Sequence, residues 1–181
     1  WKEINVPHHT STRRPEEISR TRPYIDLERQ VSSELDDIHY TSVVFCAAAT
    51  KLYECENNPA RTRKVNVDGI VSLAENFSKK DSHLLFLSSN QVFDGKVPKR
   101  TSKDLVNPIN EYGRQKVESE KRILKLASSS VLRLTKVIHT DLPLLKKWGD
   151  SLMNGRKIEA YSNVNLAPVM LLDVVKKIND F

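Results

Sequence analysis

The sequence has 181 residues, of which 39% are hydrophobic and 29% charged, a balance typical of a globular domain in water. Its net charge of +6 comes from scattered Lys and Arg residues that form no stripe with aromatic residues, which argues against nucleic-acid binding. Because no apolar run has the length of a membrane span and no signal peptide is recognised, we expect a cytoplasmic protein. Two cysteines are too few for a disulfide framework or a cysteine-rich metal site, and we expect no metal.

Short apolar runs rich in β-branched and aromatic residues predict three buried strands, at 42–49, 83–89 and 130–134. Two weaker strand patterns precede them, at 6–12 and 24–27. Apolar residues at helical spacing predict four helices, over 59–78, 110–127, 142–154 and 169–180. The alternation of strands and helices indicates an α/β fold, with a parallel sheet that helices cover on both faces.

Helix boundaries are indicated by capping residues. Asn58 as N-cap, followed by Pro59, is typical of a helix start. Asp141 is the predicted N-cap of helix 142–154, and Gly155 its C-terminal stop. The irregular stretch 90–109 is long for a compact domain, and such loops are often functional.

Two adjacent serines, Ser88 and Ser89, end the strand at 83–89, where parallel sheets bind ligands. Taken alone, such a pair is more often only a polar strand end. Downstream, Tyr112 and Lys116 lie four residues apart and therefore on one helix face. A lysine charge nearby lowers the pKa of a tyrosine, so the phenol could exchange a proton with a carbonyl substrate that a serine hydroxyl holds. A nicotinamide would supply the hydride.

The segments SSNQVFDG (88–95) and NPINEYGRQKVESEK (107–121) resemble the extended short-chain dehydrogenase/reductase family. The resemblance is closest to the reductases of the dTDP-4-dehydrorhamnose reductase type, which act on sugar nucleotides. It implies that Ser89 is the catalytic hydroxyl and Tyr112 the proton donor. It also implies that Lys116 tunes Tyr112 and holds the nicotinamide ribose, while Asn66 supports the lysine through water. Without the resemblance, Asn66 would be interpreted as a polar residue on a solvated helix face.

The same resemblance implies cofactor-binding residues. Arg13 and Arg14 follow the predicted strand at 6–12, which corresponds to the family's second strand, where arginine favours the 2′-phosphate of NADP and an acid favours the 2′-hydroxyl of NAD. The alternative is a solvated basic turn. Asp26, with Leu27 beside it, matches a strand-end position near the adenine. The small residues of the turn at 46–50, which would pass under the cofactor or merely pack, are Ala47, Ala48 and Ala49.

The family's Gly-x-x-Gly-x-x-Gly loop does not occur in these 181 residues, whose five glycines are too far apart to form it. We therefore expect a Rossmann-type doubly wound parallel sheet that lacks the first strand and the glycine-rich loop. A fragment of a longer protein is the favoured explanation, and natural loss in a binding relative is the alternative. The predicted domains are an NAD(P)-binding domain over 1–140 and the start of a small substrate-binding portion over 141–181.

The predicted function is NADP-dependent reduction of a 4-keto nucleotide sugar, with NAD as the alternative cofactor and a homodimer as a candidate assembly. As a fragment, this chain alone could be inactive. Departures from the family at Cys46, Asn90 and Gln91 leave the sugar unidentified. Two alternatives stay open: a sugar-nucleotide epimerase or dehydratase, and a non-catalytic relative that binds a nucleotide or sugar nucleotide.

Overall fold

The computed structural model describes residues 7–32, 35, 38–159, 162 and 166–181. The chain forms two compact units, residues 1–133 and residues 134–181, and each is described by itself. The domain boundary at residue 140 stays a prediction.

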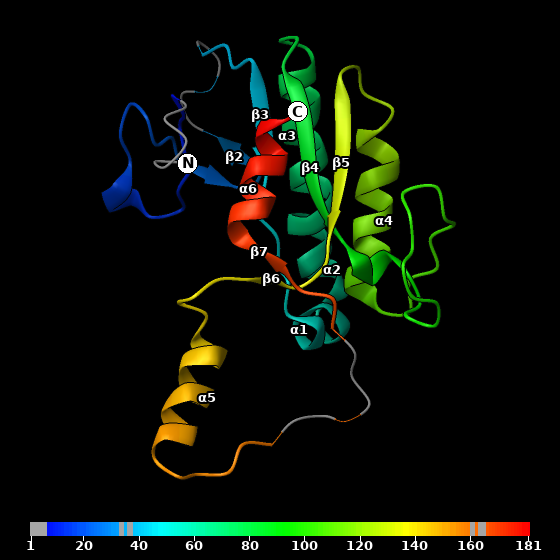
Figure 1. Ribbon diagram of the computed structural model, residues 1–181. Coiled ribbons are helices and arrows are strands. Elements are labelled where there is room, and N and C mark those ends of the chain that lie inside the picture. The colour runs from blue at the N-terminus through cyan, green and yellow to red at the C-terminus, as the bar shows by residue number, and fades with distance from the viewer. Residues whose placement is uncertain (1–6, 33–34, 36–37, 160–161, 163–165) are drawn as a thin grey trace. The chain divides into compact units, whose positions relative to one another are not determined.

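The first unit is built on a three-stranded sheet in the order β3-β4-β5 (Figure 1). Its strands are β3 (Ser42–Phe45), β4 (His83–Ser89) and β5 (Ser129–Leu134). Strands β3 and β4 run parallel, with Phe45 opposite Phe86. The predicted α/β class with a parallel sheet is confirmed, as are the strands at 83–89 and 130–134.

Helices cover this sheet where helical spacing predicted them. The stretch over 59–78 is continuous and consists of α2 (Pro59–Arg63), the π-helical segment η3 (Lys64–Gly69) and α3 (Ile70–Ser78). Helix α4 (Glu111–Ile123) is shorter than the predicted 110–127. Helices α3 and α4 contact each other, and both pack against β4. The apolar residues that predicted the first helix are all buried in the core or at its edge: Val67, Ile70, Val71, Ala74 and Phe77.

The N-terminal region differs from the prediction. In the expected strand at 6–12, Val6 lies outside the described residues and 7–11 have no regular structure. Thr12 forms an isolated bridge with Tyr24. The expected strand at 24–27 is reduced to β1 (Ile25–Asp26), which pairs antiparallel with β2 (Val31–Ser32), a strand that was not predicted. A 3₁₀ turn, η2 (Pro15–Glu17), lies between these segments.

The strand expected over 42–49 ends at Phe45, so the prediction was wrong for its second half. Residues 46–50 have no strand partner, because the backbone N–H and C=O of Ala49 bond to the Asn66 side chain instead, at 2.7 and 3.0 Å. A short helix that was not predicted, α1 (Leu52–Asn57), follows this turn.

The second unit contains β6 (Val137–Ile138) paired parallel with β7 (Val169–Met170), and the helices α5 (Pro143–Met153) and α6 (Leu171–Asn179). Both helices were predicted, although Val169 and Met170 belong to a strand. Asp141 is not the N-cap of α5: Leu142 takes that position, and Asp141 pairs with Lys146 at 2.9 Å. Gly155 ends the helix with φ +65°, as expected. None of the described helices is long and apolar enough to cross a membrane.

Candidate active site

Ser89 and Tyr112 meet at the carboxyl end of β4. Ser89 is the last residue of the strand, and its Oγ accepts a hydrogen bond from the Gln91 N–H at 3.2 Å, which starts the 3₁₀ turn η4 (Asn90–Val92). Tyr112 lies in the first turn of α4 and is only 8% exposed. Its phenol lies close enough to the Ser89 side chain for the serine to act on the pKa of the phenol. The strand end therefore holds a hydroxyl pair, as the sequence predicted.

Gly113 and Asn110 fix the start of α4 against the end of β4. Asn110 is the N-cap: its Oδ1 accepts the Gly113 N–H at 2.8 Å, and its Nδ2 donates to Oε1 of Gln91 at 2.7 Å. A Cβ on Gly113 would lie 2.2 Å from the Gln91 carbonyl oxygen. Only glycine lets the helix approach this closely, and the approach brings Tyr112 to Ser89.

Burial has the largest effect on the pKa of the Tyr112 phenol. It raises the pKa of the phenol, the nearby Cys55 raises it further, and the Ser89 side chain acts in the opposite direction. The expectation that Lys116 lowers this pKa is not met in the structure. The lysine ammonium lies over the Tyr112 ring at 5.8 Å and is directed to other partners, so its charge does not offset the burial of the phenol.

Lys116 is buried under the site, with 3% of its surface exposed. Its Nζ donates to the Leu87 carbonyl at 2.9 Å and lies 4.3 Å from the centre of the Phe86 ring. Burial lowers the pKa of Lys116 to about 8, while Glu120 and then Cys46 act to raise it. The ammonium therefore stays charged at neutral pH but releases its proton more readily than an exposed lysine does.

Replacement of Lys116 by Met is expected to change how stability depends on pH. Between pH 8 and the ordinary lysine pKa of 10.5, the unfolded chain holds a proton that the folded chain has released, so Lys116 makes stability rise with pH. The slope reaches about 1.4 kcal/mol per pH unit. Urea unfolding between pH 7 and 10 should show the wild type gaining stability relative to Lys116→Met above pH 8.

The exposed Lys121 on the same helix provides the control, because Lys121→Met removes a lysine without removing a buried charge. Parallel pH profiles for the wild type and Lys116→Met would contradict the lowered pKa.

Asn66 lies on the π-helical segment and is 1% exposed, which overturns the interpretation of a solvated helix face. Its Nδ2 donates to Oε1 of Gln115 at 2.8 Å, and its side chain also bonds to the backbone N–H and C=O of Ala49. Asn66 makes no direct hydrogen bond with Lys116 within the described structure. Its observed role is to hold the turn that contains Ala47, Ala48 and Ala49 beside the site.

Gln115 is a residue that sequence reasoning missed. It is 2% exposed, and its Nε2 donates to Oγ1 of Thr62, to the Pro59 carbonyl and to Oε1 of Glu111. In the sequence, only its position next to Lys116 on the predicted helix could have indicated that Gln115 belongs to the site. Gln115 thereby ties α4 to α2 and orients Asn66.

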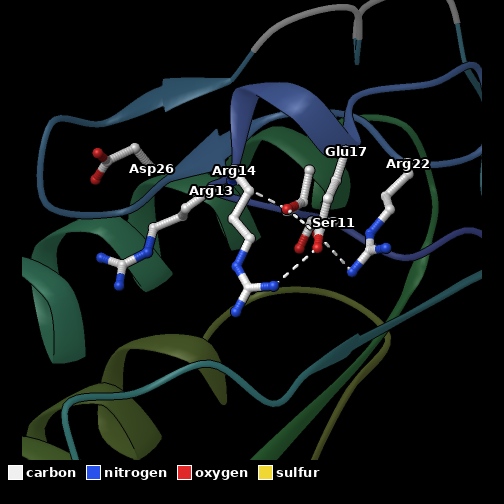
Figure 2. Close-up of a pocket in the computed structure, with 7 residues that line it drawn as sticks. Ser11, Arg13, Arg14, Glu17, Arg22 and Asp26 are labelled. Atoms are coloured by element: carbon white, nitrogen blue, oxygen red, sulfur yellow. Dashed lines mark hydrogen bonds and ion pairs between the residues drawn. The ribbon is translucent and has the colours of Figure 1, made fainter.

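A second site lies at the N-terminal end of the first unit. It is an open pocket of about 620 Å³, lined by Ser11, Thr12, Arg13, Arg14, Glu17, Arg22 and Asp26 (Figure 2). The predicted residues Arg13, Arg14 and Asp26 are thus brought together. Leu27 does not line the pocket: its side chain is 8% exposed and belongs to the core, and its backbone lies against Gly69.

Glu17 and Arg22 also line this pocket, although sequence reasoning missed them. Arg22 reaches it because the bridge between Ser19 and Arg22 folds the chain back. In the described part of the chain, no group of three or more His, Cys, Asp or Glu side chains could hold a metal ion.

Comparison with known proteins places the chain among sugar-nucleotide reductases and their relatives. It is 37% identical over 93 residues to methionine adenosyltransferase 2 subunit beta of Bos taurus, covering 51% of this chain and 28% of that protein. It is 32% identical over 106 residues to dTDP-4-dehydrorhamnose reductase of Aggregatibacter actinomycetemcomitans, covering 58% of this chain and 36% of that protein. The chain thus spans about a third of the length of these curated relatives.

Solved structures show the same fold. A hypothetical dTDP-4-dehydrorhamnose reductase from Sulfolobus tokodaii matches with a TM-score of 0.81 at 20% identity, over 99% of this chain and 65% of that one. The dTDP-4-dehydrorhamnose reductase from Bacillus anthracis, in complex with NADP, matches with a TM-score of 0.72 at 23% identity. The match covers 79% of this chain and 52% of that one. The enzyme WbmG from Bordetella bronchiseptica, in complex with NAD, matches with a TM-score of 0.70 at 22% identity. The match covers 84% of this chain and 48% of that one. The predicted Rossmann-type fold is confirmed.

The family match covers most of the chain. Residues 7–142 match the family described as the RmlD substrate binding domain, a range that includes Ser89, Tyr112 and Lys116 as well as the arginine-lined pocket. The resemblance to reductases of the dTDP-4-dehydrorhamnose reductase type is confirmed. The chain belongs to the RmlD substrate-binding domain family.

Proposed function

We propose that this chain is the nucleotide-binding and catalytic part of an NADP-dependent reductase of a 4-keto nucleotide sugar. The observation that carries the proposal is the placement of Ser89 at the end of β4 beside the buried Tyr112 and Lys116 of α4. This edge of a parallel sheet is where α/β folds bind their ligands. Cys46 and Cys55 are free thiols, in keeping with a reducing, cytoplasmic setting.

The residues present suit a nicotinamide nucleotide in two places. Arg13 and Arg14 contribute guanidinium groups to the open pocket, the chemistry that recognises phosphate. At the sheet edge, the buried hydroxyl of Ser88 has no hydrogen-bond partner among the described residues. Lys116 has three donors and makes one hydrogen bond with the described residues, to the Leu87 carbonyl, so its other donors could bind a ribose. Asp26 would face the adenosine, and the turn at Ala47, Ala48 and Ala49 would pass beside the cofactor.

In the proposed reaction, Ser89 donates a hydrogen bond to the carbonyl oxygen of the sugar and holds it beside Tyr112. A nicotinamide nucleotide, when bound, would supply the hydride that the carbonyl carbon accepts. Tyr112 gives its phenolic proton to the carbonyl oxygen as that oxygen gains charge, and the product is an alcohol. The phenolate that forms then regains a proton from solvent, while the Lys116 ammonium would hold the ribose of the cofactor.

Titration with NADPH and with NADH, followed by nucleotide fluorescence, tests the cofactor part of this proposal. We expect tighter binding of NADPH, because Arg13 makes no hydrogen bond or ion pair with any described residue and is available for a 2′-phosphate. Binding of neither nucleotide would contradict the proposal.

A second candidate function is that of a non-catalytic subunit that binds a nucleotide. The observation that favours it is the 31–37% identity to methionine adenosyltransferase 2 subunit beta from several vertebrates, which by its name is one component of a larger enzyme. A subunit of this kind would bind the nucleotide but would transfer no hydride.

A further inference from the structure

Glu17 is placed at the centre of the arginine-lined pocket and is fully engaged there (Figure 2). Its Oε1 pairs with Nη1 of Arg14 at 2.9 Å, and its Oε2 pairs with Nη2 of Arg22 at 2.8 Å. Oε2 also accepts a hydrogen bond from Oγ1 of Thr12 at 2.9 Å. One carboxylate therefore occupies two of the three guanidinium groups of the pocket.

The charges that remain for a ligand are fewer than the three arginines suggest. The hydrogen bonds with Thr12 and Arg14 hold the pKa of Glu17 below its usual range, so the carboxylate is ionised at neutral pH. Asp26 is a second carboxylate on the pocket wall. Three positive and two negative side chains leave one net positive charge, and Arg13 has no acidic partner in hydrogen-bonding or ion-pair contact among the described residues.

A carboxylate and a phosphate compete for the same donors, because both accept paired hydrogen bonds from a guanidinium group. An incoming phosphate would have to share Arg14 and Arg22 with Glu17 or displace it. The carboxylate would also repel the phosphate directly, at a distance well within the screening length of physiological salt.

We propose that Glu17 is a specificity-determining residue of this pocket, which restrains the affinity for nucleotides that carry a 2′-phosphate by occupying Arg14 and Arg22. This inference rests on the proposed function, in which the pocket receives the adenosine end of the cofactor. Arg13 binds the 2′-phosphate, and Glu17 determines how strongly NADP is preferred over NAD.

The test uses two small probes that differ only in the 2′-phosphate: adenosine 2′,5′-bisphosphate and 5′-AMP. Glu17→Gln keeps the size of the side chain and an acceptor for Thr12 but removes the charge. By calorimetry, this variant should bind the bisphosphate about tenfold more tightly than the wild type, because two charge-assisted donors are released. Binding of 5′-AMP should stay within about twofold, since its single phosphate does not reach these donors.

Glu16→Gln is the matched control, because Glu16 belongs to the same 3₁₀ turn and does not line the pocket. It removes the same charge and should leave both affinities unchanged. Arg13→Gln, as an independent variant, should weaken the bisphosphate but not 5′-AMP. Thermal melts of each variant establish that the chain is folded.

An unchanged ratio of the two affinities in Glu17→Gln would overturn the inference and leave the proposed function standing. A loss of 5′-AMP binding in that variant would also overturn it, since Glu17 would then be a ribose ligand. If neither probe binds to the wild type or to any variant, the nucleotide site itself fails, and the proposed function fails with it.

Discussion

Replacement of Tyr112 by Phe is expected to lower the rate of 4-keto sugar reduction about 10²–10⁴-fold, the usual contribution of a general acid. In the proposed reaction the phenol is the proton donor, and phenylalanine keeps the ring that packs over Lys116 while removing the proton. The nucleotide affinity should hardly change, because the arginine-lined pocket is formed by other segments. Steady-state oxidation of NADPH with dTDP-4-dehydrorhamnose measures the rate, and nucleotide fluorescence measures the affinity.

Tyr53→Phe is the control, because it also removes a tyrosine hydroxyl. Tyr53 is 82% exposed on α1 and lies outside the proposed active site. It should retain the full rate. Equal rates for the wild type and Tyr112→Phe would show that the phenol donates no proton. No measurable rate in the wild type, with nucleotide binding retained, would favour the non-catalytic subunit.

Gly113→Ala is expected to destabilise the protein by about 3 kcal/mol, at the upper end of the range for overpacking. The added Cβ would lie 2.2 Å from the Gln91 carbonyl oxygen and 2.9 Å from Cβ of Pro108, and one of these neighbours is backbone that cannot rotate away. Helix α4 would have to move from the end of β4, which would separate Tyr112 from Ser89. Urea unfolding measures the loss of stability, and the reductase rate should fall as well.

Gly149→Ala is the matched substitution, because Gly149 also lies within a helix, α5, and a Cβ there meets nothing within 4 Å. This change should be neutral or should stabilise the helix by up to about 1 kcal/mol. A Gly113→Ala variant that is as stable as the wild type would show that the close contact between α4 and Gln91 does not position the site.

Elements with a strong repeating pattern were predictable from the sequence. Strands β4 and β5 and the helical stretch over 59–78 are long enough for their apolar periodicity to determine both type and limits. The short strands were not predictable, because a pair such as β1 and β2 depends on partners that the local sequence does not specify. The predicted strand at 42–49 ended early for a similar reason: Asn66, seventeen residues away, takes the hydrogen bonds of Ala49.

The sequence predicted which residues form the candidate site at the end of β4, but not the pKa values or ion pairs of the two sites. A serine pair at a strand end and a four-residue helical spacing indicated the site, the family resemblance selected Ser89, and the fold brings it near Tyr112 and Lys116. That Tyr112 is a weaker acid than usual follows from its burial, which no local pattern contains. Glu17 and Arg22 were missed because their roles arise from contacts across a turn, and charged residues in such turns are usually only solvated.

The most direct test of the proposed activity is to follow the hydride itself. The protein is incubated with NADPH that carries deuterium at the transferable position and with a 4-keto nucleotide sugar, and the product is examined by mass spectrometry and NMR. The proposed function predicts an alcohol with deuterium on its C4 carbon, formed by the wild type and by Tyr53→Phe but strongly reduced in Tyr112→Phe. Bound nucleotide with no deuterium in the sugar would contradict the reductase and leave a protein that binds the cofactor without using it.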